Sequence, residues 1–158
     1  MQWLRAKQSE DPAEFWKGVE ARRGGPVTWS SFATLLGRPG GGRQELAGLL
    51  YVVSGTAYFE DFEKDSWLGK LVTGGKKFQK TELTFALGEV EQVKAVSRGA
   101  AAACVAGITP PDALREAPRL AQWFSPPVLQ VSMRDGTALF LDLMERRAFI
   151  ALVTAARS

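Results

Sequence analysis

The chain has 158 residues and a mass of 17.2 kDa, and 46% of its residues are hydrophobic, 23% charged and 10% aromatic. This profile predicts one soluble globular domain, which at this length can bury about 70% of its unfolded surface without a disulfide or metal. Because the chain has no histidine and a single cysteine, Cys104, its composition excludes histidine-based catalytic triads, the common zinc sites and any intramolecular disulfide.

The charge is mildly positive, with a formal net charge of +3 and a pI near 9.2. This excess is compatible with anionic partners but lies far below the basic arm of a typical nucleic-acid binder. The first residues have no apolar core of a secretory signal, and the longest apolar stretch, residues 100–108, is less than half of the ~20 residues that cross a bilayer. We therefore expect a cytoplasmic protein with at most peripheral membrane contact.

Two helices are expected near the N-terminal end. Ser9 can cap the first, Pro12 lies in its first turn, and the glycine pair at Gly24 ends it. Its apolar positions recur at helical spacing and are Phe15, Trp16 and Val19. A second, short helix is predicted over residues 29–36, with inward-facing Phe32, Leu35 and Leu36. The apolar side of the first helix needs a surface to pack against.

A glycine-rich run at residues 37–43 invites comparison with phosphate-binding loops. The P-loop pattern ends in Gly-Lys followed by Ser or Thr, but neither Gly69-Lys70 nor Gly75-Lys76 has the earlier glycine or the following hydroxyl. We therefore interpret the run as a connector.

The hydrophobic period changes to that of strands at residue 46. Residues 46–53 and 56–63 are predicted to form a hairpin around the turn Ser54-Gly55. Residues 81–87 and 90–96 alternate apolar and polar side chains, which predicts two half-buried strands. A second hairpin is expected where residues 128–133 and 137–143 flank Arg134-Asp135-Gly136, because Asp-Gly is a strong turn signal.

Residues 98–127 separate the middle strands from the second hairpin. This stretch begins Ala-rich and continues with a helix start at residues 109–112. The apolar positions that follow at helical spacing are Leu114, Leu120 and Phe124. Because Pro118 interrupts them, we expect a short or kinked helix that ends by Ser125.

The last element returns to helical spacing over residues 145–156. Asp142 and Glu145 resemble a capping box at its start. One face of the expected helix carries apolar side chains at i, i+3, i+4 and i+7, namely Phe149, Leu152, Val153 and Ala156. This pattern predicts an amphipathic helix that closes the domain.

Short antiparallel strands followed by one terminal amphipathic helix are typical of a small β-barrel or orthogonal sandwich. Residues 48–59, GLLYVVSGTAYF, resemble the opening hairpin of GRAM domains, a branch of the pleckstrin-homology (PH) superfold, with Val53 in place of the usual threonine. Residues 85–96 resemble that family's middle strand and the acidic segment after it, with Val90 and Val93 at the aliphatic positions. Residues 129–152 resemble its final hairpin and C-terminal helix.

The resemblance implies an α+β fold, a PH-like antiparallel β-barrel capped by a C-terminal α-helix and preceded by an N-terminal helical extension. On this basis, residues 1–45 form the helical extension and residues 46–158 the barrel domain, with residues 98–127 as an Ala/Pro-rich insertion. It also implies binding rather than catalysis, because PH-like domains bind anionic lipid headgroups or other proteins and carry no catalytic apparatus.

The first candidate site is the loop at residues 69–80, which has no acidic residue and four lysines, Lys70, Lys76, Lys77 and Lys80. Its glycines allow backbone amides to approach a phosphate. Each lysine near an anionic surface contributes about 1 kcal/mol, so the loop predicts weak, salt-sensitive attachment to lipid. The alternative is a solvated connection, because loops are polar by default. The first hairpin also lacks the Lys/Arg pattern of lipid-binding PH domains.

The second candidate site lies in the insertion and consists of Leu120, Trp123 and Phe124. At least three of the five tryptophans lie outside the expected barrel, where they could serve as anchors for a protein partner or pack against their own domain. A short helix with a proline inside it is poorly stabilised by propensity alone. Either a protein partner or a second copy of the chain holds it, or the Ala-rich insertion packs over one end of the barrel.

An enzyme that uses carboxylates is the third hypothesis. The acidic residues at 60–65 alternate between the two sides of a strand, so they do not converge as a metal site or an acid–base pair requires. We interpret them as a polar outer face compensated by lysine. Near the basic loop, Phe78 and Trp67 alone could stack on nucleic-acid bases, so no nucleic-acid partner is expected.

Together these observations predict a non-catalytic binding module without cofactor or metal. Its expected role is protein–protein interaction or assembly, and the alternative is peripheral binding to anionic lipid headgroups through residues 69–80.

Overall fold

The computed structural model describes residues 12–61 and 82–157. In these residues seven antiparallel strands form one sheet in the order β4-β3-β2-β1-β7-β6-β5. The strands are β1 (Val27–Gly37), β2 (Leu46–Val53), β3 (Thr56–Asp61), β4 (Glu82–Ala86), β5 (Val90–Val96), β6 (Val128–Met133) and β7 (Ala138–Leu143). The helices are α2 (Pro12–Arg23), α4 (Arg98–Val105), α5 (Arg119–Phe124) and α6 (Arg146–Ala156), with single 3-10 turns η2 (Leu87–Glu89) and η3 (Pro111–Ala113).

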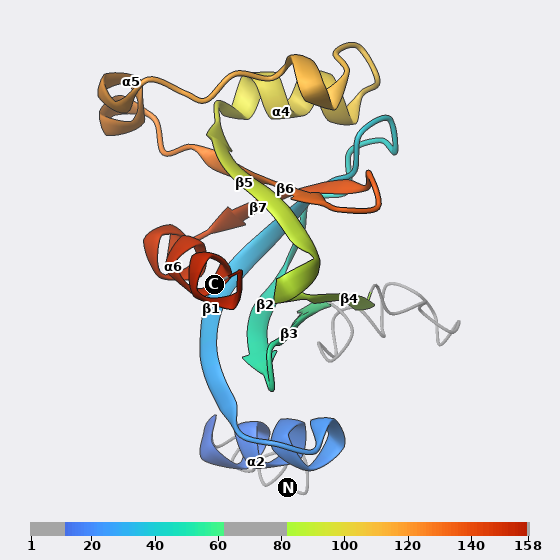
Figure 1. The fold of residues 1–158 in the computed structure, drawn as a ribbon, viewed down its shortest axis with the longest axis vertical. Helices are drawn as coiled ribbons and strands as arrows, with labels where there is room; N and C mark the ends of the chain where they lie inside the picture. The colour runs from blue at the N-terminus through green and yellow to red at the C-terminus, as the bar shows by residue number, and fades with distance from the viewer. Residues whose placement is uncertain (1–11, 62–81, 158) are drawn as a thin grey trace, which may run out of the picture.

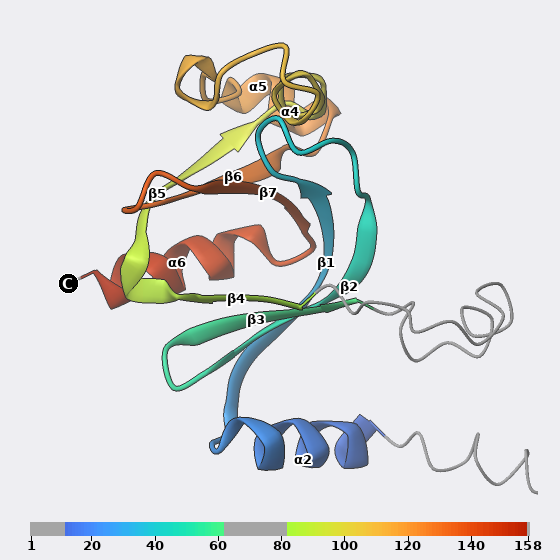
Figure 2. The same cartoon turned by 90° about the vertical axis from the view of Figure 1, so that its right-hand side faces the viewer.

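The sheet curls into a half-barrel, and α6 lies in its opening, between the β3–β4 side and the β5–β7 side (Figure 2). Helices α2 and α4 lie outside the sheet at opposite ends of the molecule (Figure 1). The expected α+β fold, a PH-like barrel closed by a C-terminal helix and preceded by an N-terminal helix, is confirmed by this arrangement.

Both predicted hairpins are present. Ser54 and Gly55 have φ angles of 49° and 77°, the positive values that a two-residue turn of type I′ requires, and Val53 pairs with Thr56 across it. In the second hairpin Gly136 has a φ of 91° and the amide of Met133 donates to the carbonyl of Thr137 at 2.8 Å. The predicted first hairpin extends to residue 63, and its last two residues lie outside the described part of the chain.

The predicted helix over residues 29–36 is wrong, because these residues belong to β1. Ser31, Ala33 and Leu35 are buried at every second position, whereas Phe32, expected to face inward, is 57% exposed. The larger apolar residues Phe32, Leu35 and Leu36 are spaced as they would be on one face of a helix. The buried side chains instead alternate along a strand, and two of them, Ser31 and Ala33, are small residues that were not counted in the helical pattern. Hydrogen bonds to β2 on one side and β7 on the other place β1 at the centre of the sheet. Of the described residues before position 46, α2 alone is therefore helical.

The sheet is buried on both faces. The largest core lies inside the half-barrel and includes Leu50, Phe59 and Leu141 together with Phe149 of α6. A second core lies between α4 and the β5–β7 part of the sheet, and a third packs Val19 of α2 against β2. This arrangement explains why β2 is apolar at consecutive positions rather than in alternation.

The insertion differs from the single interrupted helix that the sequence predicted. Its Ala-rich start forms α4, which Ser97 caps by accepting a hydrogen bond from the amide of Ala100 at 3.1 Å. The expected helix start at residues 109–112 makes only η3, and Leu114 packs in the core beneath α4 instead of continuing a helical face. Helix α5 then ends at Phe124, where the sequence predicted the end.

The glycine-rich run after β1 is a connector, as expected, and it also caps α4. The amide of Gly40 donates to the carbonyl of Cys104 at 2.9 Å, and that of Gly42 to the carbonyl of Val105 at 3.0 Å. These bonds satisfy carbonyls at the end of α4 that have no partner within a helix. A side chain at Gly37, where φ is 143°, would meet the carbonyl oxygen of Gly42 at 2.8 Å.

Helix α6 is confirmed, but its predicted capping box is wrong. Asp142 lies in β7 and forms an ion pair with Arg98, and the N-cap residue Glu145 makes no side-chain capping bond. The helix is held by packing instead, because Phe149 is fully buried with its ring centroid 5.7 Å from that of Trp29 and 6.5 Å from that of Phe85.

Candidate functional site

A groove of about 1130 Å³ lies between the insertion and the start of α6. We call it the α5–α6 groove. One wall of the groove comes from the insertion and includes Glu116, Arg119 and Trp123. The opposite wall, which we call the α6 wall, includes Met144, Arg147 and Ile150. Ala95 of β5 and Leu129 of β6 also line the groove. Figure 1 shows α5 and α6 toward its left-hand side, with α5 above α6.

The predicted partner residues on α5 are all strongly exposed. Trp123 is 88% exposed, Phe124 84% and Leu120 74%, and none of the helix's six residues is buried. Trp123 lines the groove, whereas Leu120 and Phe124 lie on the same helix without lining it. The alternative that these side chains pack against their own domain therefore does not hold for α5.

Sequence reasoning missed the apolar side chains of the opposite wall. Met144 is 71% exposed, and Ile150 lies one position from the buried Phe149. The sequence could have indicated that Ile150 is exposed. Neighbouring residues on a helix point about 100° apart, so the side chain next to the buried Phe149 does not face the core. Met144 precedes the helix, and no periodic pattern applies to it.

The short helix α5 is positioned by the chain before it. The amide of Ala117 donates to the carbonyl of Ala95 in β5 at 2.8 Å, and the ammonium of Lys94 donates to the carbonyl of Leu114 at 2.8 Å. The side-chain amide of Gln122 then donates back to the carbonyl of Ala117 at 2.8 Å. Residues 114–117 thus lie along the outer edge of β5 and fix where α5 begins.

The groove carries charges of both signs. Glu116 and Arg119 lie on the insertion wall, and Glu145 and two arginines, Arg146 and Arg147, lie on the α6 wall. Arg146 donates to the carbonyl of Leu143 at 3.3 Å, so its guanidinium is used partly within the chain. Arg147 is exposed. The groove therefore combines exposed apolar side chains with charges of both signs.

The other predicted site, formed by Lys70, Lys76, Lys77 and Lys80, lies outside the described residues. In the chain it stands between β3 and β4.

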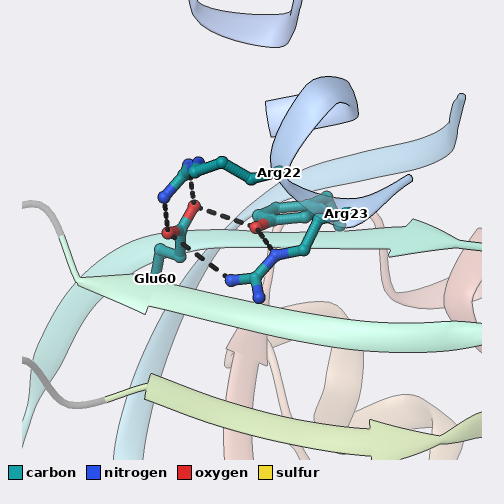
Figure 3. A network of polar contacts seen from close by, with 4 residues as sticks. Arg22, Arg23 and Glu60 are labelled. Atoms are coloured by element: carbon teal, nitrogen blue, oxygen red, sulfur yellow. Dashed lines mark hydrogen bonds and ion pairs between the residues drawn. The ribbon is translucent and has the colours of Figure 1, made fainter. Parts of the chain in front are cut away.

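A polar network on the outer face of the sheet holds α2 (Figure 3). Arg22 reaches the two carboxylate oxygens of Glu60 at 3.3 and 3.4 Å, and the Tyr51 hydroxyl donates to the same carboxylate at 3.0 Å. The Nε of Arg23 donates to the Tyr51 oxygen at 3.0 Å, and its guanidinium lies 4.2 Å from the centre of the Tyr58 ring. Burial raises the pKa of Tyr51.

For Glu60, the first of the acidic residues at 60–65, this network corrects the interpretation as part of a solvated outer face. Glu60 is nearly buried and forms ion pairs with Arg22 and Arg23 of α2, whereas residues 62–65 lie outside the described part of the chain. Its oxygens are occupied by hydrogen bonds that fasten a helix to the sheet, so the network has a structural role. The signal was present in the sequence as the Arg22-Arg23 pair at the end of α2, but its distance of 38 positions from Glu60 hid the pairing.

Metal and thiol chemistry find little support in the described residues. Within them no three His, Cys, Asp or Glu side chains come together as metal ligands, and no helix there is long and apolar enough to cross a membrane. Cys104 lies on the buried face of α4 and is fully buried, and this burial raises the pKa of its thiol. It therefore behaves as a small hydrophobic side chain.

Comparisons with known proteins show likeness at the level of structure. No family model matches the sequence, and no curated protein matches it. The C-terminal domain of an unknown protein from Leishmania infantum is similar over 93% of this chain and 98% of that domain, with a TM-score of 0.53 and 11% identity. The PH domain of ArhGAP27 aligns over 81% of this chain and 92% of its own, with a TM-score of 0.36 and 16% identity. The Leishmania domain thus shares the fold, and the PH-like class of this chain rests on its own strand order and closing helix.

Proposed function

We propose that the chain is a non-catalytic, PH-like binding module that mediates protein–protein interaction or assembly in the cytoplasm. The observation that carries the proposal is the α5–α6 groove, where Trp123, Met144 and Ile150 expose large apolar side chains from two facing walls. Apolar anchors surrounded by a charged rim are typical of surfaces that bind other proteins.

We assign the module to the GRAM branch of the PH superfold on its first hairpin. The glycine that opens the GRAM-like segment is Gly48, and a side chain there would meet the backbone carbonyl of Glu60 at 2.1 Å. The motif glycine thus has a physical reason in this chain, because it lets β2 and β3 approach closely. The assignment favours a binding role over catalysis.

The proposal is tested by site-specific photo-crosslinking in cell extract. A benzophenone amino acid replaces Trp123 in one variant and Ile108 in the control, because Ile108 is 79% exposed and does not line the groove. We expect a discrete crosslinked adduct from position 123 that is lost when Phe124→Ser and Ile150→Ser are added. The same adducts from position 108, or none from position 123, would overturn the assignment of the groove.

The alternative function is peripheral binding to anionic lipid headgroups through Lys70, Lys76, Lys77 and Lys80. It is supported by the sequence of residues 69–80, which has four lysines and no acid. Co-sedimentation with anionic and neutral vesicles at low and physiological salt tests it, since electrostatic binding weakens with ionic strength. Salt-sensitive binding to anionic vesicles alone, lost when the four lysines become glutamate, would support it. Unchanged sedimentation of that variant would remove the loop as the lipid site.

A further inference from the structure

The α5–α6 groove and the most exposed helix of the described chain belong to one continuous face. Trp123 lines the groove, and Leu120 and Phe124 protrude from the same helix. Met144 and Ile150 supply apolar surface on the opposite wall. On such a face, the protruding apolar helix of one molecule could pack into the apolar groove of another molecule with the same face.

The charges on this face, which are of both signs on each wall, are compatible with a second copy of the chain. Glu116 stands on the insertion wall and Arg147 on the α6 wall, and both are exposed. In an interface with two-fold symmetry, residue i of one copy meets residue j of the other and the reverse contact is also made. Bringing the insertion wall of one copy onto the α6 wall of another would pair Glu116 with Arg147 twice. A face of a single sign would instead repel its own copy.

From this face we propose that the partner is a second copy of the chain, in a two-fold dimer in which each α5 packs against the α6 wall of the other copy. The inference rests on the proposed function and names its partner. Trp123 and Phe124 each offer roughly 150–250 Å² of surface, and a standard interface buries about 800 Å² per partner. With Leu120, Met144 and Ile150 added, the apolar face approaches that size.

The construction of α5 agrees with a helix that a second copy stabilises. The helix has six residues, no side-chain cap at Pro118 and no buried residue. Helices this short are marginal in water unless an apolar face is packed. Here the three large apolar side chains face outward, and packing against a second copy would cover them.

The dimer is tested by sedimentation velocity on the full chain between about 1 and 100 µM, because self-association depends on concentration. We expect a species of twice 17.2 kDa that the double change Trp123→Ser with Phe124→Ser converts to the monomer. The matched control Ile108→Ser removes an equally exposed apolar side chain outside the groove and should leave the dimer intact. Circular dichroism verifies that each variant is folded.

A charge swap then distinguishes a two-fold dimer from other forms of association. Glu116→Arg alone and Arg147→Glu alone each place like charges together twice, so each should raise the dimer dissociation constant about tenfold or more. An equimolar mixture of the two variants restores opposite charges at both contacts and should recover the dimer. Failure of the mixture to recover it would overturn the proposed geometry.

The outcome also separates this inference from the proposed function. If the native chain stays monomeric at about 100 µM while position 123 still crosslinks to a different protein, the second copy is excluded and the groove keeps its binding role. If neither association nor crosslinking occurs, both proposals fail.

Discussion

At the scale of single residues, Gly48 leaves less room for a side chain than any other glycine of the described residues. It pairs with Asp61, and a methyl group there would lie 2.1 Å from the carbonyl oxygen of Glu60 and 3.0 Å from the Phe59 ring. The Glu60 carbonyl belongs to the backbone of β3 and cannot move without disturbing the β2–β3 ladder. We expect Gly48→Ala to lower the free energy of unfolding by about 3 kcal/mol, as forced overpacking does.

Urea denaturation measures this loss, and Gly99 provides the control. Gly99 lies in α4, and an added methyl group would meet nothing within 4 Å. Because alanine favours helix over glycine by up to about 1 kcal/mol, Gly99→Ala should stabilise the protein slightly. Equal effects at the two glycines would contradict the steric explanation.

The free energy of unfolding is predicted to fall at alkaline pH because of Tyr51. Burial is the main cause that raises its pKa above the ordinary value of 10.0, and the nearby carboxylate of Glu60 acts in the same direction. Below pH 10 the phenol is protonated in both states, so its contribution is complete. Above pH 10 the unfolded phenol ionises first, and stability is lost as the pH rises toward the folded pKa.

The variant Tyr51→Phe should remove this part of the pH dependence. At neutral pH we expect it to lower the free energy of unfolding by about 1 kcal/mol, because the hydrogen bonds with Glu60 and Arg23 are lost. Above pH 10 its stability should fall less steeply than that of the native chain. Identical slopes in urea titrations at pH 9 to 11 would show that Tyr51 does not cause this loss of stability.

At the scale of elements, the docking of α2 depends unequally on its two terminal arginines. The Arg23 side chain is 18% exposed and contacts Tyr51, Tyr58 and Glu60, whereas that of Arg22 is 50% exposed and contacts Glu60. Exposed ion pairs contribute little, so Arg22→Ala should cost less than about 0.5 kcal/mol. Arg23→Ala removes a largely buried partner and should cost about 2 kcal/mol.

Limited proteolysis and urea denaturation of both variants test this ranking. If α2 is held chiefly through Arg23, the Arg23→Ala variant should be cleaved faster near Gly24 than the Arg22→Ala variant, because local opening of α2 exposes the following chain. A reversed order would assign the docking to Arg22.

The elements that sequence reasoning identified are those whose signals are local. Ser54-Gly55 and Asp135-Gly136 specify their hairpins through backbone angles that few other residues adopt, and α6 repeats its apolar residues at one period. The sequence pattern of β1 predicts a helix, because the pairing that makes it a strand involves other parts of the chain. β1 is hydrogen-bonded to β2 on one edge and to the distant β7 on the other, and no local sequence pattern indicates this pairing. The residues of α5 were identified from their helical spacing in a short, proline-interrupted segment outside the expected barrel, whereas Met144 and Ile150 became part of the site only when the fold brought the start of α6 opposite the insertion.

At the scale of the whole molecule, the sheet joins three apolar cores. Phe140 of β7 lies in the core under α4, while its neighbours Leu139 and Leu141 lie inside the half-barrel. The same strand therefore supports both faces. Because the cores share strands, the insertion that carries α4 should unfold together with the barrel rather than before it.

The accessibility of Cys104 measures whether α4 unfolds together with the barrel, because this residue of α4 is fully buried in the second core. Its exposure requires α4 to leave both the sheet and the glycine-rich connector, whose Gly40 amide donates to the Cys104 carbonyl. We expect thiol labelling in the native state to yield an opening free energy within about 1 kcal/mol of that for global unfolding. Because burial is the main cause of the raised pKa of the Cys104 thiol, an opened form loses this shift, and labelling rates are referred to the unfolded chain at the same pH. A labelling free energy several kcal/mol below the global value would show that residues 98–127 open as a separate unit, and the two cores would then be energetically independent despite their shared strand.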